Sequence, residues 1–138
     1  MIKVFEAPNL YNNSIHLGSD KLFLAGGITN CPDWQSEAIQ ILKEKDKEYL
    51  MNVFVLNPRR QNFPIDDPNA AMEQIAWEYK YLEKSNIILF WFSSGSLNPI
   101  VLYELGMWGN SKNAKNKKIF IGCDKEYSRI QDVTIQTQ

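Results

Sequence analysis

This sequence has few of the residues on which many catalytic sites depend. Its 138 residues include one histidine, His16, and two cysteines, Cys31 and Cys123. His16 sits in the polar stretch 12–20, so histidine catalysis is not expected, and the absence of a Cys-x-x-Cys motif argues against a metal site. Two cysteines do not make a disulfide framework, so we interpret both as reduced thiols of a cytoplasmic protein.

The sequence also lacks a long apolar run and an excess of charge of one sign. Its longest apolar run, 87–92, is far shorter than the roughly 20 residues that a membrane-spanning helix needs, and no apolar segment of signal-peptide length follows the start. Basic and acidic residues nearly balance, at 15 and 16. We therefore expect neither a membrane nor a nucleic acid polymer as a partner.

Apolar residues make up 44% of the chain, and they fall in short runs that alternate with segments of helical period. A chain of this size and composition predicts one domain, residues 1–138, with a normal core. Strands are predicted at 2–7, 21–25, 51–56, 87–92 and 119–122, with a weaker strand pattern at 133–135. Helices are predicted between them, so the fold class is α/β: a parallel sheet of about five strands with helices on both faces.

Three helices have readable starts or apolar stripes. The first opens at Pro32 with Asn30 or Cys31 as its cap, and its stripe is Trp34, Ala38, Ile41 and Leu42. The second covers 70–85, with the stripe Met72, Ile75, Tyr79 and Leu82. The third follows 87–92, with Asn98 as N-cap and Pro99 at the first helical position.

Parallel sheets bind ligands beyond the carboxyl ends of their strands. The segments that follow successive strands here are GGIT, NPRR, FSSGS and GCDKEY, so glycines, arginines and hydroxyls are expected at one rim. Gly26 and Gly27 would let the backbone approach a ligand closely. A plain tight turn explains the pair equally well.

Two helical glutamates, Glu78 and Glu104, flank the central strand 87–92 in sequence. Two carboxylates at one pocket can perform glycoside chemistry, in which one attacks the anomeric carbon and the other handles the proton of the leaving group. This chemistry requires neither histidine nor a metal. The alternatives are a glutamate favoured by the helix dipole for Glu104 and a solvated helix face for Glu78.

Other residues have both a binding and a structural interpretation. Arg59 and Arg60 suit a phosphate or carboxylate, or a surface ion pair. Trp34, just after the first strand's loop, is a candidate for the pocket, whereas Trp91 and Trp108 are interpreted as core. Ser96 and Asn98 suit a sugar or simply the loop that holds them.

Five motifs occur in the order found in nucleoside 2-deoxyribosyltransferase-like proteins, closest to a bacterial and phage branch. They are FLAGGIT at 23–29, PDWQ at 32–35, LNPRR at 56–60, WEYKYLEKSNIILFWF at 77–92 and PIVLYELG at 99–106. The tail YSRIQDVTIQ, 127–136, also resembles that branch. The resemblance implies a Rossmann-like or flavodoxin-like fold and cleavage of a nucleoside N-glycosidic bond through a covalent sugar–carboxylate.

The resemblance also assigns roles to residues. Glu104 matches the family's nucleophile and Glu78 its acidic residue in the preceding helix, and the loop of Gly26, Gly27 and Ile28 lies beside the sugar or its 5′ group. Phe23 stands where classical members have a tyrosine that orients the nucleophile, and Ser93 stands where they have an aspartate that contacts the base. Family sites are completed by C-terminal residues of a neighbouring subunit, so a homo-oligomer is expected, with Asp132 or Gln136 in that role.

Three hypotheses follow for a small-molecule nucleoside or nucleotide ligand. The first is an enzyme without a cofactor that cleaves or transfers at the N-glycosidic bond, with Glu104 and Glu78 catalytic. Its expected ligand contacts are Gly26, Gly27, Ile28, Trp34, Arg59, Ser93 and Asn98. The second is a nucleotide-binding or sensing module on the same fold, which the altered positions Phe23 and Ser93 support. The third is a glycohydrolase of a nicotinamide dinucleotide.

Overall fold

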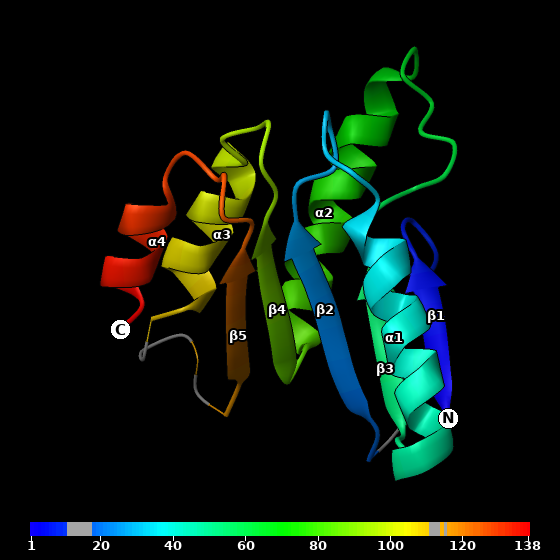
Figure 1. Cartoon of the computed structure of the whole chain (residues 1–138). Helices are drawn as coiled ribbons and strands as arrows, with labels where there is room; N and C mark the ends of the chain where they lie inside the picture. Colours follow the sequence, from blue (N-terminus) through cyan, green and yellow to red (C-terminus); the bar gives the residue numbers. More distant parts are fainter. Residues whose placement is uncertain (11–17, 111–113, 115) are drawn as a thin grey trace.

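The structure, a computed structural model, describes residues 1–10, 18–110, 114 and 116–138 (Figure 1). His16 lies outside the described residues. The strands are β1 (Ile2–Glu6), β2 (Asp20–Gly26), β3 (Val53–Asn57), β4 (Ile87–Phe92) and β5 (Lys118–Cys123). The helices are α1 (Trp34–Tyr49), α2 (Pro68–Lys84), α3 (Pro99–Trp108) and α4 (Ile130–Gln136). The five main strands were thus predicted to within two residues at each end.

The strands form one parallel sheet in the order β1-β3-β2-β4-β5. The α/β class and the parallel sheet of five strands predicted from the sequence are confirmed. From β2 the chain passes to β3 on one side, and from β4 it passes to β5 on the other. The order therefore reverses between β2 and β4, which is where α/β sheets of this kind open a crevice for ligands.

Alternate side chains of β4 enter two different cores. Ile88, Phe90 and Phe92 are fully buried in the larger cluster, together with side chains of α2, α3 and α4. Leu89 and Trp91 point the other way and pack on the smaller cluster beside α1. The prediction of helices on both faces is confirmed, with α1 alone on one face and α2, α3 and α4 on the other.

Helix α1 begins two residues later than predicted. Its N-cap is Asp33, not Asn30 or Cys31, because the Asp33 carboxylate accepts the Ser36 backbone N–H at 3.1 Å. The predicted stripe is right except for Ile41, which is half exposed. Ala38 and Leu42 do pack on the smaller core, as does Ile39.

The predicted apolar stripe of α2 is right only at Leu82, which is buried in the larger core. Met72 and Ile75 are each 65% exposed, whereas Trp77 and Tyr81 are buried and their rings pack at a tilt of 57°, with 4.8 Å between centroids. Burying these two large aromatic rings removes more apolar surface from water than burying a methionine and an isoleucine does. The helix is consequently rotated relative to the prediction, and Glu78 does not lie on a solvated face.

The weak strand pattern at 133–135 is also wrong, because these residues belong to α4. Val133 is buried in the larger core, and Arg129 pairs with Asp132 at 2.9 Å across one helical turn. β-Branched residues favour strands only where a sheet surface receives them. In the described part of the chain, no helix is both long and apolar enough to span a bilayer.

Candidate active site

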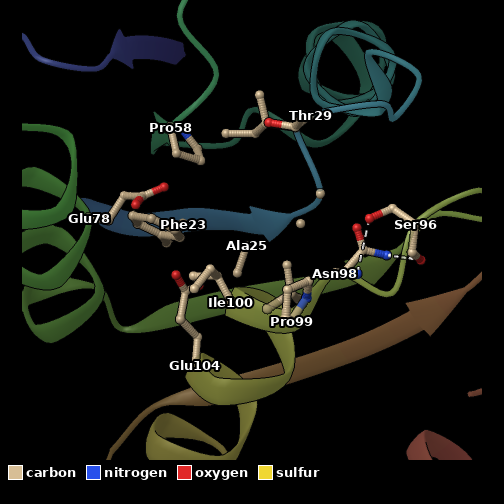
Figure 2. A pocket seen from close by; sticks show the side chains of 14 residues that line it. Phe23, Ala25, Thr29, Pro58, Glu78, Ser96, Asn98, Pro99, Ile100 and Glu104 are labelled. Carbon is tan, nitrogen blue, oxygen red and sulfur yellow. Dashed lines mark hydrogen bonds between the residues drawn. The ribbon is translucent and has the colours of Figure 1, made fainter. Parts of the chain in front are cut away.

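A cavity of about 300 Å³ opens at the point where the strand order reverses (Figure 2). Its walls come from β2, the loop after β2, the residue that follows β3, the loop between β4 and α3, and the helices α2 and α3. Its size suits a small organic ligand. The lining residues are Phe23, Ala25, Gly26, Gly27, Ile28, Thr29, Pro58, Glu78, Ser96, Asn98, Pro99, Ile100, Val101 and Glu104.

Glu78 and Glu104 extend into this cavity from two different helices, α2 and α3 (Figure 2). Burial raises the pKa of Glu78, a hydrogen bond with the side chain of Gln74 lowers it by a smaller amount, and the net result is an increase from 4.5 to about 7. Burial and, to a smaller extent, the nearby charge of Glu78 together raise the pKa of Glu104 to about 8. The two carboxyl groups therefore interact and titrate close to neutral pH.

Such a pair holds one proton between its two members over part of the neutral range. The ionised member is a nucleophile or a base, and the protonated member is a proton donor. The geometry thus supplies both groups that glycoside cleavage needs.

The floor of the cavity between the two glutamates is apolar. Phe23 is 1% exposed and its ring packs against Trp77 at 6.0 Å between centroids. The Phe23 side chain lies between Glu78 and Ala25 in Figure 2. A phenyl ring offers no hydrogen bond to either carboxylate, so this residue contributes to the burial that raises both pKa values.

Gly26 and Gly27 are required by close packing within the protein. A Cβ on Gly26 would come within 2.2 Å of the Trp34 indole, and one on Gly27 within 1.9 Å of Asn98 Oδ1. The Trp34 Nε1–H donates to the Gly27 carbonyl at 3.3 Å. Trp34 therefore supports the loop from behind, in the smaller core, and does not line the cavity.

Asn98 connects the two loops that border the cavity. Its backbone has a φ of 51°, in the left-handed region that asparagine tolerates. As predicted it is the N-cap residue of α3, although its side chain does not cap the helix. The amide instead donates to the carbonyls of Ser93 and Ser96, and Oδ1 accepts from the Cys31 thiol at 3.3 Å.

Two further expected contacts do not line the cavity, Arg59 and Ser93. The Ser93 side chain is buried, and among the described residues its hydroxyl finds no hydrogen-bond partner. The Arg59 guanidinium donates to backbone carbonyls of the β2–α1 loop. Asp132 and Gln136, expected in a neighbouring subunit's site, line a separate cavity against α3 and β5.

Two glutamines near the cavity, Gln74 and Gln35, were not predicted from the sequence. Gln74 lies one helical turn before Glu78 and donates to the Pro58 carbonyl at 2.7 Å, so it ties α2 to the loop after β3. Gln35 is fully buried, and its amide donates to the Gly27 carbonyl while its Oε1 accepts from Arg59. The i, i+4 spacing to Glu78 was the available signal for Gln74. For Gln35 the sequence offered no signal other than its position in the motif PDWQ.

Among the described residues, no group of three or more His, Cys, Asp and Glu side chains could hold a metal ion. A family model described as nucleoside 2-deoxyribosyltransferase like matches residues 19–127. No curated protein matches the chain in sequence. The matched span includes every residue that lines the cavity.

Proposed function

This chain belongs to the nucleoside 2-deoxyribosyltransferase-like family, and on that premise we propose that it cleaves the N-glycosidic bond of a (deoxy)nucleoside or nucleotide. The sugar passes to a second base or to water. The observation that carries the proposal is the pair of largely buried carboxyl groups, Glu78 and Glu104, in one cavity beyond the carboxyl ends of β2 and β4.

In the first step the ionised Glu104 carboxylate attacks C1′ of the sugar. A C1′–O bond forms as the C1′–N bond breaks, and the electron pair of that bond leaves with the base. Protonated Glu78 gives its proton to the departing base, which leaves neutral, and it becomes a carboxylate. In the second step Glu78 takes a proton from water or from an incoming base as that nucleophile displaces Glu104 from C1′.

The raised pKa values support a proton shared by the pair, whereas the division of roles rests on the match of Glu104 to the family's nucleophile. In the empty cavity the lower pKa of Glu78 leaves the shared proton on Glu104, so this proton passes to Glu78 when the sugar binds. Glu78 titrates at about 7 and Glu104 at about 8 in the empty cavity, so the pair keeps a proton available near neutrality. The positive charge that develops on the sugar in the transition state stabilises an ionised Glu104 beside C1′. Asn98 lies on the side of the cavity away from the glutamates in Figure 2. Together with Gly27 and Ile28, which also line the cavity, it is our proposed contact for the rest of the ligand.

A nucleotide-binding module that no longer turns over is the second candidate. Phe23 gives the glutamates no hydroxyl, and the Ser93 side chain does not reach the cavity. Both positions depart from the pattern that the resemblance implies for catalysis. This candidate requires ligand binding without release of a base.

A homo-oligomer is part of the proposal. Ile75 and Tyr79 on α2, and Ile100 and Tyr103 on α3, are more than half exposed, and Ile100 also lines the cavity. Apolar residues concentrated beside a site are typical of an interface. Light scattering during size-exclusion chromatography would measure the mass; a monomer at all concentrations would contradict this part.

The test is incubation of the protein with deoxynucleosides, their monophosphates and a nicotinamide dinucleotide, each with and without a second free base. Chromatography would follow the free base and any exchanged nucleoside. Two variants accompany it: E104Q, and the control E37Q, which changes an exposed glutamate at the start of α1. Activity present in E37Q and absent in E104Q supports the proposal. A ligand-induced shift in melting temperature without turnover supports the binding module, and full activity of E104Q refutes the mechanism.

A further inference from the structure

Arg59 occupies an unusual position between two loops that border the cavity. It follows β3 directly after Pro58, and its side chain is only 18% exposed. The guanidinium crosses from this loop to the one between β2 and α1, which forms the cavity wall at Gly27 and Ile28. An arginine beside a nucleotide pocket would ordinarily be assigned to a phosphate. Here the guanidinium already has protein partners.

Its hydrogen bonds are directed at the backbone of one short loop. One terminal nitrogen, Nη2, lies 3.2 Å from the Ile28 carbonyl oxygen, 3.1 Å from that of Cys31 and 2.9 Å from that of Pro32. The Gly27 carbonyl is at 3.4 Å. Four carbonyl oxygens thus surround one nitrogen and share its two hydrogens.

The rest of the side chain is fixed as well. Its Nε–H donates to Gln35 Oε1 at 2.9 Å, and Nε lies 3.4 Å from Asp33 Oδ1. Gln35 in turn donates to the Gly27 carbonyl at 3.4 Å. Buried carbonyl groups need donors, and charge-assisted hydrogen bonds are the stronger kind. A guanidinium meets several such acceptors at once because its donors form a rigid planar fork.

We propose that Arg59 is a positioning residue that holds the β2–α1 loop as one wall of the cavity, and that it acts on the ligand through Gly27 and Ile28. The consequence for the ligand rests on the proposed function of the cavity. A trans peptide points its C=O and N–H in opposite directions. A Gly27 carbonyl held toward Arg59 therefore turns the Ile28 N–H away from the guanidinium, so that this N–H remains available to a ligand oxygen.

The neighbouring Arg60 provides a matched comparison. Its guanidinium lies 5.2 Å from the Phe63 ring centroid and 3.8 Å from the Glu73 carboxylate. Both partners lie outside the β2–α1 loop. A change at Arg60 removes the same charge one residue away without removing a donor to the loop carbonyls.

The first measurement is amide hydrogen exchange of the β2–α1 loop in the wild type and in the variants R59K, R59M and R60M. The Cys31 backbone N–H donates to the Ile28 carbonyl at 3.3 Å, and Arg59 holds that carbonyl, so we expect exchange at Cys31 to rise roughly tenfold or more in R59M. In R59K the loop amides should be only partly protected from exchange, because the lysine ammonium group lacks the planar fork with which the guanidinium bonds both the loop and Gln35. R60M should match the wild type. This readout does not depend on turnover, so it separates failure of this inference from failure of the proposed function.

The second measurement uses 2′-deoxyadenosine and its 5′-monophosphate as probes, in thermal-shift binding and in steady-state kinetics. We expect R59K to raise KM or Kd roughly tenfold for both probes, with a smaller change in kcat. Unchanged loop exchange in both R59K and R59M would overturn the proposal. If loop exchange is unchanged and only the monophosphate binds more weakly, a direct contact between Arg59 and the phosphate explains the result, and the proposal is overturned.

Discussion

The two walls of the cavity are built in opposite ways. The helical wall carries Glu78 and Glu104, whose ionised forms are disfavoured by burial and, for Glu104, also by the charge of Glu78. The loop wall at Gly27 and Ile28 has its carbonyls supplied with donors from Arg59, and that of Gly27 also from Trp34 and Gln35. On the helical wall the ionisation of the carboxyl groups is energetically costly, whereas on the loop wall the carbonyl groups have hydrogen-bond donors.

The difference indicates how the site divides its tasks. Groups that take part in bond breaking must change charge, so they are kept where ionisation is costly and their pKa values lie near neutrality. Groups that only hold a ligand are more effective when they do not move. Changes on the helical wall should therefore alter rate and pH dependence, and changes on the loop wall should alter binding and stability.

The largest effect is expected from removing the proposed nucleophile on the helical wall. E104Q keeps the size of the side chain but cannot form the covalent sugar ester, so the rate should fall by about 10³-fold or more. Ligand binding should persist, because the loop wall is intact. Single-turnover kinetics with a deoxynucleoside would measure the rate, and a thermal shift would measure binding; loss of binding together with rate would contradict the division between the walls.

The pH dependence of stability should report the same wall. Glu78 and Glu104 have folded pKa values of about 7 and about 8, above the ordinary 4.5. Between pH 4.5 and 8 the folded state therefore holds more protons than the unfolded state, so the free energy of unfolding falls as pH rises. Urea denaturation from pH 5 to 9 would measure this slope. E78Q should reduce this slope, and the double variant E78Q/E104Q should nearly remove it. An unchanged slope in the double variant would show that other titratable groups cause the pH dependence.

The same pair predicts a pH optimum for activity. The singly protonated pair is most populated between about 7 and about 8, so kcat/KM should be bell-shaped with its maximum in that interval. The pH profile of E78Q should lose one of its two limbs. The substitution should also lower the pKa of Glu104, because the Glu78 charge no longer opposes ionisation. A profile of E78Q identical to the wild type would show that Glu78 does not share the proton.

On the loop wall, G27A should cost stability before it costs rate. The new Cβ would lie 1.9 Å from Asn98 Oδ1 and 2.4 Å from Cys31 Sγ, so we expect a loss of about 1–3 kcal/mol and weaker ligand binding. G106A is the control, because a Cβ there, within α3, meets nothing within 4 Å. It should stabilise the protein by about 0.5–1 kcal/mol. Equal effects of the two changes on stability would show that the loop can move to accommodate the new Cβ.

The smallest effect is expected where the two walls meet, at Phe23. F23Y places a hydroxyl in the cavity that lies between them. If the hydroxyl donates to an ionised glutamate, the pH optimum should move down by about one unit or less. The measurement is the pH profile of kcat/KM, with F54Y as control, because Phe54 is buried elsewhere and does not line the cavity. A shift to higher pH would mean that the hydroxyl does not stabilise the carboxylate.

Sequence alone determined the alternation of strands and helices, the parallel sheet and the residues at its carboxyl rim. These follow from local patterns: the apolar run 87–92 has the length and composition of a buried parallel strand, and the proline after Asn98 marked the start of α3. The two glutamates and the glycine loop were also selected from sequence, with the help of the family resemblance. The part of the site that depends on strand ends was therefore predictable.

Only the tertiary structure decided the rotation of α2, the helical conformation of 133–135 and the partner of Arg59. Helical period alone did not tell which of two apolar stripes on α2 faces the sheet. Trp77 and Tyr81 are the buried pair, because large rings remove the most apolar surface from water. Arg59 meets the carbonyls at 27–32 only when β2 and β3 lie side by side. Both outcomes depend on contacts between residues far apart in the chain, which a local pattern does not contain.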